Sequence, residues 1–291
     1  SSLLLILPFF RSSAIWPNPH VLAIILLLAS VYFFQKWQLS ENKKLNLNFI
    51  LHIILLALTL YTRRYYVFLF FYYFLFYIKY LSIKELLITF FLISLLSIPG
   101  LILVYNFPFY LTSSGYSFKF YNTFLIIPSI FILYIFPFIQ YELIQKKSLE
   151  TILLLIISFT LTIIASYYFD YNPKLGGGYL MKASNILSLG NYFFYLTAIL
   201  GIYFIIKLST KNKEDLILIL LVFFTFSNNY MFQKYFEPLF LIFILIFFKA
   251  KFLTNFLKSN YQIFFILIYF LAYSLSALIS SYYKISIGFF W

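Results

Sequence analysis

Long apolar runs, separated by short clusters of charged residues and prolines, follow one another along almost the whole chain. Ten segments can be drawn: 19–34, 49–62, 65–78, 86–105, 123–144, 151–169, 191–206, 216–226, 239–248 and 261–280. Their apolarity is continuous, whereas the strands of a membrane barrel alternate between apolar and polar residues. Only helices and closed barrels satisfy their own backbone hydrogen bonds in lipid. The pattern therefore predicts an all-α, polytopic transmembrane helical bundle of about ten or eleven spans.

The polar connections are too short to hold a soluble domain, so we expect residues 1–291 to form a single integral membrane domain. Residues 1–10 are a further apolar run, which is too short for a span of about 20 residues. We interpret this run as the end of a helix that begins upstream. A processed terminus is the alternative, although the run lacks the basic start and the small-residue cleavage site of a signal peptide.

Composition excludes a soluble fold and any chemistry that depends on Cys. The chain is 64% hydrophobic and 10% charged, against about 45–50% and about 25% in soluble domains. It has no Cys and only two His, which are far apart, so we expect no metal site and no cofactor, with a divalent metal left as an open alternative. The net charge of +13 is spread without a basic stripe, which favours membrane lipid over nucleic acid as the partner.

The distribution of basic residues predicts the orientation. If the connection after Phe34 is cytoplasmic, most of the 21 Lys and Arg residues lie on the cytoplasmic side of a bacterial inner membrane or an organellar membrane. All three arginines then lie on the outer side, although the rest of the chain uses Lys. The outer side also holds two carboxylates, Asp170 and Glu237, which we regard as the candidates for a catalytic acid or base.

The outward arginines are the first indication of function, because a guanidinium offers a fixed fork of donors that fits phosphate or carboxylate. Arg63 and Arg64 lie between two apolar segments with almost no loop to solvate them. We interpret them as ligands of a substrate phosphate, and anchors that reach lipid phosphates are an equal alternative. Arg11 and His20, on the same side, are further candidates for substrate binding.

A second polar cluster, residues 227–238, lies between two unusually short apolar runs, a pattern typical of broken helices that line a site. Lys234 and Glu237 are three residues apart, so a helical turn would put them on one face. We expect Lys234 to bind the phosphate, and Tyr230 and Gln233 to contact the substrate. An ordinary outer loop with a neutralised ion pair is the alternative. A third stretch, 170–179, is rich in glycine but lacks the spacing of a phosphate loop, and we expect a flexible outer loop there, with a substrate lid as the alternative.

The layout of many spans, outward basic residues and small cytoplasmic loops resembles the GT-C superfamily of membrane glycosyltransferases. Residues 61–66, YTRRYY, look like the arginine-containing run of its dolichyl-phosphate-glucose branch, and residues 232–238, FQKYFEP, look like a basic motif near a late helix. The resemblance implies a hexosyltransferase that moves a sugar from a polyprenyl-phosphate carrier, its lipid-linked donor, to an acceptor on the periplasmic or lumenal side. That superfamily places its catalytic acid in the first outer loop, which would then precede Ser1, so neither Asp170 nor Glu237 takes this role by position.

Two other classes of protein fit the same pattern. A transporter, flippase or polymerase of lipid-linked glycans would use the outward basic residues to bind an anionic head group. A noncatalytic subunit of a membrane complex would need the basic residues only as membrane anchors. The sequence does not identify its protein partners.

Overall fold

The computed structural model describes residues 19–41, 43–107, 119–143, 149–172, 176–186, 190–211, 213–226, 231–248 and 260–287. Regular structure in these ranges is helical, and their β-type pairing is limited to an isolated bridge between Gly176 and Met231. Each of the ten apolar segments coincides with a helix or a broken helix. The prediction of an all-α helical bundle is therefore confirmed.

The helices begin and end close to the limits of the apolar segments. In chain order they are α3 (His20–Leu39), α4 (Leu47–Thr62), η1 (Arg64–Val67), α5 (Phe68–Tyr80), α6 (Ile83–Asn106), α8 (Phe120–Leu143), α9 (Leu149–Tyr167), α10 (Gly178–Ile186), α11 (Tyr192–Lys211), α12 (Lys213–Thr225), η3 (Gln233–Tyr235), α13 (Glu237–Ile242), the π-helical turn η4 (Phe243–Phe247) and α15 (Asn260–Ile287). Among the described residues, six helices are long and apolar enough to cross a membrane: α3, α6, α8, α9, α11 and α15. These are the helices of a multi-pass membrane protein, while the number of crossings and the kind of membrane stay predictions.

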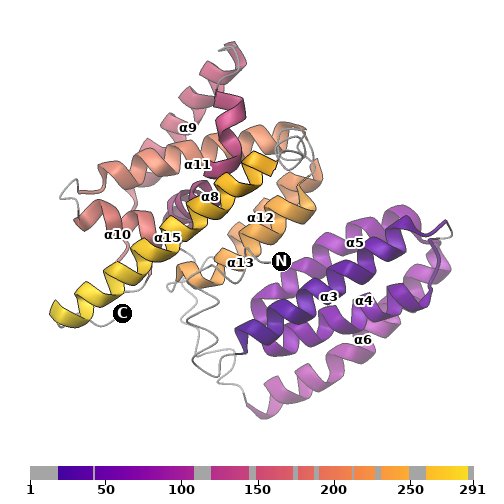
Figure 1. Ribbon diagram of the computed structural model, residues 1–291. Helices are drawn as coiled ribbons and strands as arrows, with labels where there is room; N and C mark the ends of the chain where they lie inside the picture. The colour runs from indigo at the N-terminus through magenta and orange to yellow at the C-terminus, as the bar shows by residue number, and fades with distance from the viewer. Residues whose placement is uncertain are drawn as a thin grey trace. The chain divides into compact units, whose positions relative to one another are not determined.

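The chain divides into two compact units, which Figure 1 shows as the group α3 to α6 and the group α8 to α15. We call them the N-terminal and the C-terminal unit and describe each by itself.

In the N-terminal unit, α3 and α4 pack against each other. Contacts pair Trp37 with Phe49 and Ser30 with His52, so the two helices run antiparallel. The side chain of Asn46 caps α4 by accepting the backbone N–H of Phe49. Helix α5 completes the core with an aromatic face. By contrast, α6 buries only Thr89 of its 24 residues, as a helix surrounded by lipid can.

In the C-terminal unit, α8 is the central helix. It packs against α9, α10, α11, α12, α13 and α15, and 89% of its apolar window is buried. A helix that is apolar all round belongs in such an interior. Helix α11 approaches α8 so closely that a Cβ atom on Gly201 would lie 2.1 Å from the carbonyl oxygen of Pro128. Only glycine, which has no side chain, fits at the point where α11 crosses α8.

Candidate functional site

The segment after α12 is an interrupted helix, as its sequence predicted. Met231 and Phe232 are extended, η3 follows as a single 3-10 turn, and α13 begins at Glu237 with Pro238 in its first turn. Helix α13 then passes into the π-helical turn η4. Glu237 is only 3% exposed, although it is a carboxylic acid in an apolar helix. A buried charge of this kind has to be met by hydrogen bonds.

Those hydrogen bonds come from an amide and a tyrosine. The Gln233 Nε2 atom donates to the Tyr273 hydroxyl at 2.5 Å and lies 3.5 Å from Glu237 Oε1. The Tyr273 hydroxyl in turn donates to Glu237 Oε1. The same amide donates to the Tyr134 hydroxyl at 2.9 Å. The Gln233 amide has two hydrogens, and its nearest acceptors are the Tyr273 and Tyr134 hydroxyls. Gln233 therefore holds Tyr273 in place, and the Tyr273 hydroxyl donates directly to Glu237 and orients it.

The glycine-rich stretch is fastened to the same segment. The Gly177 N–H donates to the Met231 carbonyl at 3.0 Å, and the Met231 N–H donates to the Tyr171 hydroxyl at 3.0 Å. The Tyr179 N–H, in the first turn of α10, donates to Gln233 Oε1. Burial raises the pKa of Tyr171 to about 12, above its ordinary value of about 10. The second and third polar clusters of the sequence thus form one site.

This fastening explains the glycines. Gly176 has a φ of +130°, and a Cβ atom there would lie 2.4 Å from the Met231 carbonyl oxygen. Residues 176–178 are all buried and all have positive φ. The flexible outer loop that we expected from their glycine content is instead a packed connection at this point. Its first residue pairs with Met231, and its last begins α10.

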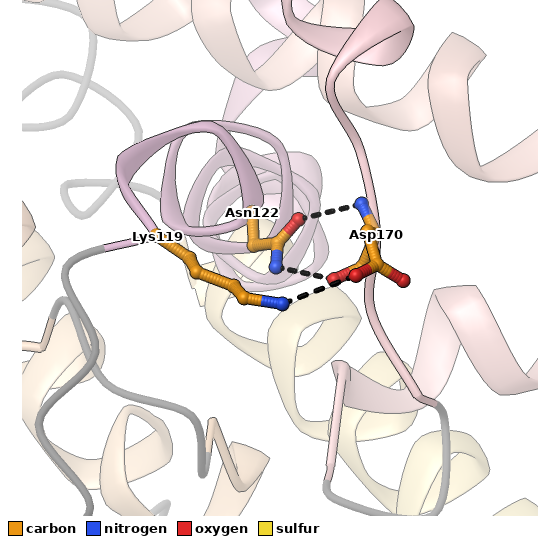
Figure 2. A network of polar contacts seen from close by, with 3 residues as sticks. All are labelled: Lys119, Asn122 and Asp170. Carbon is orange, nitrogen blue, oxygen red and sulfur yellow. Dashed lines mark hydrogen bonds and ion pairs between the residues drawn. The ribbon is translucent and has the colours of Figure 1, made fainter.

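Asp170, the other candidate carboxylate, lies on the surface of the C-terminal unit (Figure 2). Its side chain is 89% exposed and accepts from Lys119 Nζ at 3.1 Å. Asn122 Nδ2 donates to the Asp170 carbonyl at 2.7 Å, and the Asp170 N–H donates to Asn122 Oδ1 at 3.1 Å. The amide of Asn122 therefore joins the backbone that follows α9 to the first turn of α8 through two hydrogen bonds. The Lys119–Asp170 ion pair is a further contact between the same two segments.

In the N-terminal unit the structure brings His20 and Arg63 together on the ring of Tyr65. His20, the first residue of α3, is 3% exposed, and its ring stacks on Tyr65 at a centroid distance of 6.2 Å and an interplanar angle of 21°. Arg63 lies between α4 and η1, with Cζ 6.0 Å from the centre of the same ring and Nη1 3.3 Å from its hydroxyl. Arg64 follows in η1 and is exposed. The result is a cationic, aromatic cluster at one end of the unit.

Of the three remaining predicted site residues, the structure describes one. Lys234 is the middle residue of η3, and Arg11 and Tyr230 lie outside the described residues. Sequence reasoning missed Tyr134, Tyr171 and Tyr273, because nothing distinguishes three tyrosines among 28. Within the described ranges, no group of three or more His, Cys, Asp or Glu could hold a metal ion.

Comparisons of the chain with protein-family models, with curated proteins and with solved structures found no match.

Proposed function

We propose that this chain is a membrane glycosyltransferase that moves a sugar from a polyprenyl-phosphate carrier to an acceptor on the periplasmic or lumenal side. The observation that carries the proposal is the pair of His20 and Arg63 on the ring of Tyr65, with Arg64 next to Arg63 in the chain. Arginines at the end of an apolar helix pair suit a lipid-borne phosphate, because the guanidinium binds two phosphate oxygens at once. The aromatic ring beneath Arg63 holds the side chain in place.

In this reaction the acceptor hydroxyl loses its proton to a carboxylate, and its oxygen forms a bond to the anomeric carbon of the sugar. The bond between that carbon and the phosphate oxygen breaks, and the lipid phosphate leaves with the electron pair. Arg63 and Arg64 stabilise the charge that develops on the leaving phosphate. Lys234 is a candidate for the same role on the basis of the sequence.

Within the C-terminal unit, Glu237 is a stronger candidate for a base than Asp170. The Tyr273 hydroxyl donates to Glu237 and orients it, and Gln233 holds Tyr273 in place. The Asp170 carboxylate is exposed beside Lys119, where water screens its charge.

The phosphate role can be tested without knowing the sugar, by measuring binding of undecaprenyl phosphate to the purified full chain in detergent. Arg63→Ala should weaken binding about tenfold or more, since a hydrogen bond to a charged group contributes about 1.5–3 kcal/mol. Lys79→Ala, at the other end of α5, is the matched control and should bind as the unaltered chain does. Equal binding by both variants would refute the phosphate role.

Sugar transfer is the second test, with undecaprenyl-phosphate-glucose as the donor probe and released undecaprenyl phosphate as the readout. Glu237→Gln keeps the shape of the side chain and should lower the rate by about 10² to 10⁴, the usual contribution of a general base. Asp170→Asn should leave the rate close to that of the unaltered chain. A fall with Asp170→Asn and none with Glu237→Gln would reverse our assignment.

The interrupted helix around Glu237 also favours a second candidate, a transporter of lipid-linked glycans. Buried carboxylates at helix breaks commonly bind coupling ions or substrates in transporters. Movement of a fluorescent polyprenyl-phosphate lipid across vesicle membranes, with no release of free carrier phosphate, would favour the transporter over the enzyme.

A further inference from the structure

A cleft of about 400 Å³ lies between α8, α9, α11 and α12 of the C-terminal unit. This volume is within the range of about 300–1,000 Å³ that is typical of small-molecule sites. Ten of its eleven lining residues are apolar, and the remaining one, Ser209, uses its hydroxyl to donate to the Ile205 carbonyl at 2.7 Å. The cleft therefore presents an apolar surface to whatever fills it.

One stripe of α12 forms a wall of the cleft. Leu216, Leu220 and Phe223 follow one another at spacings of four and three residues, which places them on one helix face. Lys213 is three residues before Leu216, so it begins the same stripe, and its side chain is exposed. The mouth of the cleft at this end of α12 is therefore basic.

Two acidic residues follow Lys213 in the first turn of α12, but they lie off this stripe. Glu214 and Asp215 are one and two residues further along α12, and each residue turns the helix by about 100°. Asp215 is 2% exposed and points into the protein.

The length of α12 brings a lipid phosphate within reach of this mouth. The helix has 13 residues, which is about 20 Å at 1.5 Å per residue, against a hydrocarbon core of about 30 Å. A short helix is accommodated by thinner bilayer or by long flanking side chains that reach the interface, and Lys213 is such a side chain at the start of α12.

We propose that this cleft holds an acyl chain of one anionic phospholipid, whose phosphate lies at Lys213. The apolar lining fits the chain, and Lys213 on the same stripe fits the head group. This end of α12 is opposite the end that leads to Met231 and Glu237, so the lipid is separate from the sugar carrier. The inference does not depend on the proposed function.

The test places an indole in the cleft of the full chain by Leu220→Trp, at a rim position that is 44% exposed. The protein is reconstituted in phosphatidylcholine vesicles that contain equal small fractions of either acyl-brominated phosphatidylglycerol or acyl-brominated phosphatidylcholine. After the signal of the three native tryptophans, measured on the unaltered chain, is subtracted, quenching of the new indole should be stronger with the anionic lipid. Adding Lys213→Gln should reduce that preference about fivefold, the factor that corresponds to about 1 kcal/mol per basic residue at a membrane surface.

Leu196→Trp is the matched control, because Leu196 is 55% exposed on α11 and is not part of the cleft lining. It should be quenched equally by both lipids, and Lys213→Gln should not change this. Should Leu220→Trp fail to fold, Leu216→Trp, 37% exposed on the same stripe, takes its place. Equal quenching of the cleft indole by both lipids would mean that bulk lipid fills the cleft without selection for the head group. No quenching would mean that protein covers the cleft. Either result would overturn the proposal.

Discussion

His52 tests how a polar side chain holds three apolar helices together. It is fully buried in α4, where Nδ1 lies 3.0 Å from the Ser30 carbonyl of α3 and Nε2 lies 2.7 Å from the Tyr77 hydroxyl of α5. The Ser30 hydroxyl also donates to the His52 carbonyl at 3.0 Å. This network assigns the proton to Nδ1, with Nε2 accepting from Tyr77. Sequence alone showed a solitary histidine in an apolar helix.

We predict that His52→Leu destabilises the N-terminal unit by about 2–4 kcal/mol. The leucine keeps the position apolar but removes the ring hydrogen bond to the Ser30 carbonyl, and such a bond contributes about 0.6 kcal/mol on average and at most about 1.7 kcal/mol within a membrane. It also deprives the Tyr77 hydroxyl of its acceptor, and a buried polar group left unsatisfied costs about 1–3 kcal/mol. The sum is the predicted range.

The assay is reversible unfolding in mixed micelles of increasing sodium dodecyl sulfate, followed by circular dichroism. Leu58→Ala, at an exposed position on α4, is the control and should change the unfolding free energy by less than about 0.5 kcal/mol. Adding Tyr77→Phe to His52→Leu should restore part of the loss, because it removes the unsatisfied hydroxyl. Strict additivity of the two changes, or a loss no larger than that of the control, would refute the reasoning.

Two further predictions concern the C-terminal unit and use the same assay. Gly176→Ala should destabilise the unit more than Gly190→Ala. A Cβ atom at Gly176 would lie 2.4 Å from a backbone oxygen, whereas a Cβ atom at Gly190 meets nothing within 4 Å. The Gly190→Ala change therefore costs only the strain of the left-handed φ, about 1–2 kcal/mol. Equal losses for the two variants would contradict the packed connection. Asn122→Ala should cost about 1–3 kcal/mol through two hydrogen bonds to the Asp170 backbone. Asp170→Asn should cost about 0–1 kcal/mol, because it removes only an exposed ion pair, and the opposite order would show that the ion pair dominates.

The candidate site could be predicted from sequence only where its residue types were rare. Arg63 and Arg64 are two of three arginines in the chain, and Glu237 is one of eight acidic residues, so each was visible without a structure. Gln233 was found only because it lies beside Glu237. The tyrosines that complete the network were invisible, because a common residue acquires a polar role only through the partner that folding brings to it.

The structure also joined clusters that the sequence treated as separate. Residues 176–179 and 231–237 are more than 50 positions apart, and neither carries a signal for the other. Their contact depends on backbone groups, since the Met231 carbonyl and N–H pair with Gly177 and Tyr171. Every residue type carries such groups, so this pairing leaves no trace in the sequence except the glycine that a close approach requires.

The sequence by itself determined the helices, their approximate limits and their apolar character. Continuous apolarity in lipid leaves the backbone only one local solution, so each apolar segment could be assigned without knowing its neighbours. Which helix lies at the centre was decided by tertiary structure alone. Helix α8 is 89% buried in its apolar window and α6 is 6% buried, yet both are strongly apolar, with mean hydropathies of 2.0 and 2.6. Lipid and protein interior are equally apolar solvents for these side chains, and only packing distinguishes one from the other.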